Sequence, residues 1–136
     1  MFTTNFFDGL TRIGVLGEGW TFASGNYAFL LEVASVHDTP ESVVALLFLG
    51  GVGWELAVAV LMWLALFGYI RDSAPRRKLY RAFVPAVGFF ASFLALTEVF
   101  LAYDLADTLV RLFVAVLVSL LAIEYLTEWD GEGSVR

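Results

Sequence analysis

The feature that most constrains this fold is the stretch from Ser42 to Ile70, SVVALLFLGGVGWELAVAVLMWLALFGYI, which is apolar almost throughout. At about 1.5 Å per residue, a helix over this stretch is about 43 Å long, whereas a bilayer's hydrocarbon core is about 30 Å thick. The stretch therefore predicts a transmembrane helix that tilts or projects beyond the membrane at one end. Its one carboxylate, Glu55, lies near the middle, where an ionised side chain is costly and usually faces protein or water.

The composition places the whole chain in the same class. Of the 136 residues, 60% are hydrophobic and 16% are charged, which is typical of a small integral membrane protein. Because the chain has no Cys and only one His, His37, we exclude disulfides, thiolate metal centres, cysteine nucleophiles and a two-His haem site within one copy. We expect no metal, no cofactor and no nucleic-acid partner.

Two further apolar stretches predict transmembrane helices over about 78–103 and 105–129. The first helix, over 42–70, has a strong start signal, because Thr39 is a suitable N-cap and Pro40 fits the first helical position. The expected fold class is all-α: a polytopic membrane helical bundle with three strong transmembrane helices in a single domain, 1–136.

Residues 1–41 are expected to form a segment outside the three spans. Charged and polar residues interrupt the stretch from 9 to 34, namely Arg12, Glu18, Ser24, Asn26 and Glu32. We expect short helices that lie at the outer membrane interface, where Trp20 and Tyr27 suit the headgroup zone, or a short membrane-embedded helix packed against the bundle. A weakly hydrophobic fourth span is the alternative.

Basic residues concentrate in one short segment and predict the topology. They are Arg71, Arg76, Arg77, Lys78 and Arg81. By the positive-inside rule, the loop at 71–77 and its flanks to residue 81 are cytoplasmic, and so is the acidic tail at 130–136. We therefore expect a multi-pass protein of the cytoplasmic (plasma) membrane. The same basic side chains would also suit anionic lipid headgroups.

The net charge of −6 and the single Lys among eight basic residues describe an acidic, Lys-poor surface. Such a surface favours a salt-adapted organism, such as a haloarchaeon, because surface carboxylates help a protein stay soluble in high salt. An ordinary acidic protein is the alternative.

A cluster of intramembrane charges is expected from Glu55, Glu98 and Arg111. The second and third helices form a hairpin with its turn near Asp104, so Glu98 and Arg111 are about equally far from the turn on antiparallel helices. We expect them to form an ion pair, because a paired carboxylate and guanidinium relieve each other's desolvation. If Glu55 joins them, two acids surround one base, and one carboxylate can hold a proton or a cation. We expect a structural cluster, and an ion- or proton-handling role for Glu55 is the alternative.

Small residues on the first helix predict close helix packing. They are Gly50, Gly51, Gly53 and Ala57, which leave room for the backbone of another helix to approach.

Several stretches together form a recognisable order: Asn26-Tyr27-Ala28-Phe29 followed by Val33, Ser35 and Asp38-Thr39, then Glu55, then Glu98 with Phe100, and Arg111 with Phe113. In this order the chain resembles a family of predicted small integral membrane proteins, domain of unknown function 2165. The resemblance covers about Ser24 to the end of the third span. The resemblance implies a further helix before the Asn-containing segment, although the residues before Gly17 are few and polar. It implies no reaction, because the family is itself uncharacterised.

Three functional classes fit these features. The favoured one is a non-catalytic accessory or structural subunit of a larger membrane protein complex, of respiratory or transport type, with lipid and other membrane subunits as partners. The second is a small homo-oligomeric carrier or channel, coupled to an ion or proton through Glu55. The third, a membrane enzyme, is the weakest, because no nucleophile–base pair, metal-ligand spacing or phosphate loop is present. We predict that the chain is not an enzyme.

Overall fold

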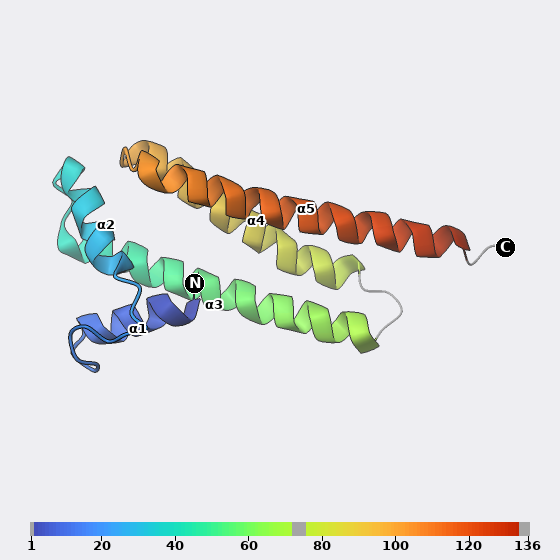
Figure 1. Cartoon of the computed structure of the whole chain (residues 1–136), viewed down its shortest axis with the longest axis horizontal. Helices are drawn as coiled ribbons and strands as arrows, with labels where there is room; N and C mark the ends of the chain where they lie inside the picture. The colour runs from blue at the N-terminus through green and yellow to red at the C-terminus, as the bar shows by residue number, and fades with distance from the viewer. Residues whose placement is uncertain (1, 72–75, 134–136) are drawn as a thin grey trace.

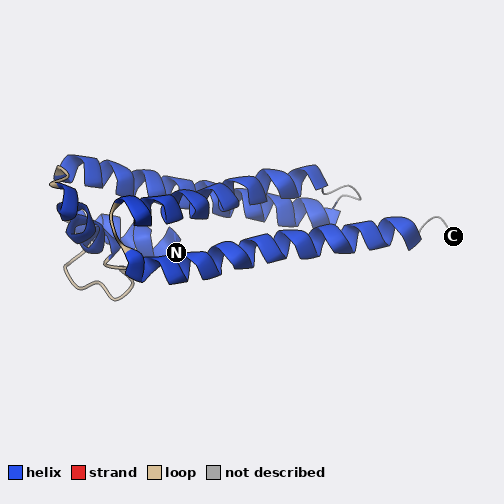
Figure 2. Ribbon diagram, turned by 90° about the horizontal axis from the view of Figure 1, so that it is seen from above, coloured by secondary structure: helices blue, strands red, loops and turns tan. Residues whose placement is uncertain are grey.

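The computed structural model describes the backbone of residues 2–71 and 76–133, and the side chains of 2–71 and 78–125. Within these ranges the chain forms helices joined by turns and loops, with no strand (Figures 1 and 2). The helical elements, in chain order, are α1 (Phe2–Arg12), α2 (Asn26–Ala34), the short 3-10 helix η1 (Ser35–His37), α3 (Glu41–Arg71), α4 (Arg76–Val99) and α5 (Tyr103–Gly133). The all-α fold expected from the sequence is confirmed.

Helices α3, α4 and α5 are each long and apolar enough to cross a membrane, which confirms the three predicted spans. α3 begins one residue before the predicted start, at Glu41, and the carbonyl of Pro40 accepts the N–H of Val44 at 3.2 Å. The loop predicted at 71–77 is shorter, because Arg71 ends α3 and α4 already begins at Arg76. Residues 72–75 and 134–136, which belong to the predicted loop and tail, lie outside the described residues.

The turn between α4 and α5 lies earlier than predicted, at residues 100–102 and not near Asp104, because α4 ends at Val99 and α5 begins at Tyr103. Leu101 has a left-handed backbone with φ 54°, and the N–H of Ala102 donates to the carbonyl of Thr97 at 2.9 Å. This arrangement satisfies a terminal carbonyl of α4 and reverses the chain within three residues. The ring of His37 joins η1 to the same turn, since its Nε2 lies 2.7 Å from the carbonyl oxygen of Val99.

The long helices lie side by side in a row, with α4 between α3 and α5 (Figure 1). Among the described helices, α5 contacts only α4, whereas α3 contacts α4 on one side and α1 and α2 on another. We call the end of the row that carries α2 and the α4–α5 turn the α2 end, and the opposite end the Arg71 end. In Figure 1, α1 runs beside the half of α3 nearer to the α2 end.

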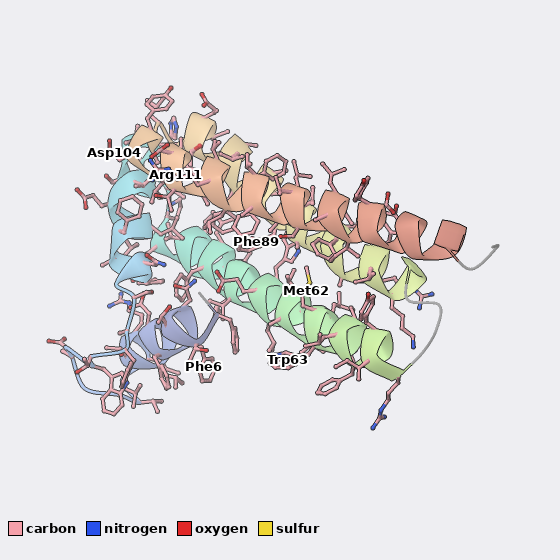
Figure 3. All side chains as sticks on the ribbon, turned by 45° about the vertical axis from the view of Figure 1, so that its right-hand side comes forward. Phe6, Met62, Trp63, Phe89, Asp104 and Arg111 are labelled. Atoms are coloured by element: carbon pink, nitrogen blue, oxygen red, sulfur yellow. The ribbon has the colours of Figure 1, made fainter. Side chains whose placement is uncertain are left out.

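The interface between α3 and α4 has two parts. Near the Arg71 end, a buried cluster is formed by Ala65 of α3 with Leu79, Ala82 and Phe83 of α4. Nearer the middle, the indole of Trp54 meets Phe89 edge to face at a centroid distance of 5.8 Å and donates its N–H to the carbonyl of Pro85 at 3.1 Å. Figure 3 shows Phe89 between the two helices. α4 continues as a helix through Pro85.

The predicted small-residue face of α3 is only partly used within the chain. A Cβ added at Gly51 would lie 3.4 Å from the ring of Phe93, so this glycine permits the close approach of α4. In contrast, a Cβ at Gly50 or Gly53 would meet nothing within 4 Å, and Ala57 is exposed. Gly51 therefore lies on another side of α3 than the other three, because about 100° of rotation per residue turns it toward α4. That another helix packs on Gly50, Gly53 and Ala57 stays a prediction.

Candidate functional site: a buried polar cluster around Glu55

Glu55 lies near the middle of α3, on the side that faces α1. Its side chain is buried at 9% exposure, and so is that of Asn5 at 7%. The side-chain amide of Asn5 donates to both carboxylate oxygens, with Nδ2 at 2.9 Å from each. One amide group from a neighbouring helix therefore solvates this carboxylate.

The other end of the Asn5 side chain is also hydrogen-bonded. Its Oδ1 accepts from the hydroxyl of Ser24 at 2.8 Å and from the amide of Asn26 at 2.7 Å. Because an amide oxygen only accepts and an amide nitrogen only donates, these two donors fix the orientation in which the NH₂ group faces Glu55. Asn5 thus links the buried carboxylate to the start of α2.

Asp8 occupies the same face of α1, three residues further on, and is buried at 8% exposure. Its Oδ2 accepts the backbone N–H of Tyr27 at 2.8 Å and lies 3.2 Å from the hydroxyl oxygen of Ser24. The residue before α2 is Gly25, which provides no side-chain cap. Asp8 therefore caps α2 from another helix, because first-turn N–H groups lack intrahelical acceptors and favour a negative charge.

We call Asn5, Asp8, Ser24, Asn26 and Glu55 the Glu55 cluster. The spacing of Asn5, Asp8 and Arg12 explains how α1 contributes to it, since residues three and four apart share a helix face. Arg12, at the end of that face, forms an ion pair with Glu41 at the start of α3. Its guanidinium also lies 5.2 Å from the ring centroid of Tyr27. The hydrogen bond to Glu41, and after it the one to Tyr27, raise the pKa of Arg12.

The structure does not bring together the three charges grouped from the sequence. Arg111 pairs with Asp107, one turn earlier on α5, at an Nη2–Oδ2 distance of 2.6 Å, and both side chains are largely exposed. Glu98 is also exposed, and no ion pair within the described residues joins it to Arg111. Glu55 does not join them, because α4 separates α5 from α3 and Glu55 faces α1. The predicted Glu98–Arg111 ion pair and the predicted grouping of Glu55 with it are therefore both wrong.

The basic residues gather at the Arg71 end as expected from the sequence. Arg71 closes α3, and Lys78 and Arg81 lie in the first turns of α4 with exposed side chains. Arg76 and Arg77 begin α4, but their side chains lie outside the described residues. Whether this end faces the cytoplasm stays a prediction.

The residues that sequence reasoning missed are Asn5 and Asp8. Their signal is the pattern of α1 itself, in which these polar residues share one side of the helix and Phe6 lies on another. Within the described part of the chain, no group of three or more His, Cys, Asp or Glu residues is placed to hold a metal ion.

Three helices of transmembrane length and a buried carboxylate held by a short neighbouring helix define a helical membrane protein. Comparisons with protein-family models, with curated proteins and with solved structures find no match to this chain. The resemblance to domain of unknown function 2165 therefore stays a prediction.

Proposed function

We propose that this chain is a non-catalytic subunit of a larger membrane protein complex. The observation that carries the proposal is the uncovered small-residue stripe on α3, formed by Gly50, Gly53 and Ala57. Transmembrane helices associate mainly through close van der Waals packing, and small residues are enriched where they do. α4 and α1 occupy other sides of α3, so the stripe is open to a helix from another subunit.

The position of α5 supports the same proposal. Among the described helices it contacts only α4, so most of its circumference faces outward. The exposed Asp107–Arg111 pair lies on this helix, near the α2 end. A neighbouring subunit would provide both the second packing surface for α5 and polar partners for this pair.

The Glu55 cluster supports a structural role for the buried carboxylate. No buried side-chain nitrogen or oxygen of the described residues lacks a hydrogen-bond partner. Each buried polar atom of the cluster therefore has at least one hydrogen-bond partner within the chain, and the cluster links α1 and α2 to α3. Such a hydrogen-bonded network favours one arrangement of the chain over others.

We further propose that the Arg71 end faces the cytoplasm and that the protein resides in the plasma membrane. The support is the grouping of Arg71, Lys78 and Arg81 at that end of the helices, which follows the positive-inside rule. Cysteine residues introduced at Arg71 and at Val36, on opposite ends, provide the test by labelling intact cells. Labelling at position 71 but not at 36 by an impermeant reagent would reverse the proposed orientation.

The subunit proposal is tested by mild detergent extraction from the source membrane and native mass measurement. We expect recovery with one or more different polypeptides, and a loss of that association in Ala57→Leu, which fills the stripe. Ala91→Leu, an equal change at an exposed position of α4, is the matched control and should retain the partner. Recovery only as a monomer or homo-oligomer would contradict the proposal.

A second candidate function, a homo-oligomeric ion or proton carrier, is favoured by one observation. The hydrogen-bond chain from Asn26 through Asn5 reaches Glu55 from the α2 end. The test compares proton and cation flux in reconstituted vesicles for the wild type and Glu55→Gln. Flux equal to the leak of empty vesicles for both proteins would rule out this function.

A further inference from the structure

We propose that α1 lies inside the bilayer as a half-spanning helix, with its polar side on α3 and an aromatic ridge in contact with lipid acyl chains. The aromatic ridge consists of Phe2, Phe6 and Phe7 of α1 with Trp20 and Phe22 of the following loop. The partner of this surface is thus the half of the bilayer nearer to the α2 end.

The first argument is the orientation of the two sides of α1. A surface helix of a soluble protein buries its apolar side and exposes its polar side. In α1 the order is reversed, because Asn5 and Asp8 are buried whereas Phe6 is 44% exposed. Figure 3 shows Phe6 on the side of α1 that faces away from α4 and α5. This orientation fits a helix whose surroundings are less polar than its protein neighbour.

The second argument is the extent of the aromatic ridge. Phe7 is within ring-contact distance of both Trp20 and Phe22, at centroid distances of 6.4 Å each. Phe6 continues the ridge along α1, at 6.1 Å from Phe7 and 5.8 Å from Phe2. Trp20 and Phe22 are themselves exposed. A contiguous apolar patch of this kind marks a protein or membrane contact, and Trp, here Trp20, is enriched at the membrane–water interface.

The third argument is depth. Arg12 meets Glu41 at the start of α3, whereas Asn5 meets Glu55, 14 positions later. At about 1.5 Å per residue, the 11-residue α1 is about 16 Å long, about half the thickness of a bilayer's hydrocarbon core, and it descends alongside α3, a helix apolar and long enough to span the membrane. Phe6 lies at the depth at which α3 itself would face hydrocarbon, while Arg12 and Glu41 lie near the headgroups.

The surface beyond α1 identifies lipid as the occupant. Continuing past Glu55, the side of α3 that α1 covers becomes an open hollow of about 230 Å³, lined by Ala59, Met62, Trp63 and Leu66. In Figure 3, Trp63 lies on the same side of the molecule as Phe6. The ridge and the apolar flank of this membrane-spanning helix thus lie on the same side of the molecule. Acyl chains suit such a flexible, wholly apolar surface, whereas polar groups on it would indicate a protein partner.

The experiment measures fluorescence quenching in reconstituted vesicles with single-tryptophan variants. One variant keeps Trp20 and replaces Trp54, Trp63 and Trp129 with Phe. The second carries Phe6→Trp and replaces all four native tryptophans with Phe. The vesicles contain phosphatidylcholine and phosphatidylglycerol brominated near the headgroup or near the chain end, and iodide is added from the aqueous side. A third variant with Val36→Trp, at an exposed position of η1, is the water-accessible control.

We expect both test variants to lose about half of their emission or more to brominated lipid and little to iodide. The Phe6→Trp variant should be quenched more strongly by bromine near the chain end, and Trp20 by bromine near the headgroup. Quenching by iodide and not by bromine would place the ridge in water and overturn the proposal. Quenching by neither would show that another protein chain covers it, which also overturns the proposal. Circular dichroism of each variant verifies that the helices are retained.

Discussion

Replacing Asn5 with Ala tests whether the Glu55 cluster holds α1 on α3. The substitution removes the only described donor to a carboxylate that is 9% exposed, and it also removes the acceptor of Ser24 and Asn26. A hydrogen bond to a charged group contributes about 1.5–3 kcal/mol. Ser24 and Asn26 are exposed, so they can find other partners and add little. We therefore expect a loss of about 2–3 kcal/mol in the free energy of unfolding.

The assay is denaturant unfolding of the protein in detergent micelles, followed by helicity and by protease cleavage between α1 and α2. A double-mutant cycle with Glu55→Ala isolates the contact from other effects of each change. We expect a coupling energy of about 1.5 kcal/mol or more, because each single variant already breaks the same interaction.

The matched control is Thr3→Ala, at an exposed position of the same helix, which should change stability by less than about 0.5 kcal/mol. Additive losses from Asn5→Ala and Glu55→Ala, or equal losses from Asn5→Ala and Thr3→Ala, would refute the assignment of the cluster as the attachment point of α1.

Three further predictions concern other contacts of the described residues. Asp8→Ala should cost about 1 kcal/mol of stability by removing the cap of α2, while Asp8→Asn, which keeps an acceptor, should cost less in the same unfolding assay. Arg12→Gln should weaken protease resistance of α1 at low ionic strength and have little effect in high salt, because its ion pair with Glu41 is half exposed. Gly51→Leu should destabilise the chain by about 1–3 kcal/mol by pushing α4 away, whereas Gly50→Leu should leave the isolated chain unchanged.

The three long helices could be predicted from the sequence because their signal is local. A long run of apolar residues determines a membrane helix whatever surrounds it, so α3, α4 and α5 were each found with boundaries within a few residues. Two boundaries differ by four residues: the end of α4, predicted at 103 and found at Val99, and the end of α5, predicted at 129 and found at Gly133. The error at the α4–α5 turn arose because Leu101 adopts a left-handed conformation that a Leu side chain rarely takes, and nothing in its residue type indicates this.

The partner of Glu55 could not be predicted in the same way. The sequence analysis placed Glu98 and Arg111 at similar depths because it put the turn near Asp104, but with the turn at 100–102, Glu98 lies three residues and Arg111 ten residues from Leu101 at its centre. Depth also does not determine whether α3 and α5 are neighbours. The order of the row puts α4 between α5 and α3, and this order depends on packing over the whole length of the helices. Asn5 was missed because α1 has 11 residues and one polar side, so hydropathy does not detect it. Such a segment is identified by a short helix that turns its polar side toward a neighbouring transmembrane helix and its apolar side outward.

The chain order of the Glu55 cluster has a consequence for biosynthesis. Each described partner of the cluster, from Asn5 to Asn26, precedes Glu55 in the sequence, and α4 and α5 contribute none. Because a chain emerges from the ribosome with its N-terminal part first, the amide that solvates this carboxylate is made before the carboxylate itself. The first half of the protein can therefore enter the bilayer with its buried carboxyl group already hydrogen-bonded, and the α4–α5 hairpin can be added to it afterwards as a second insertion step.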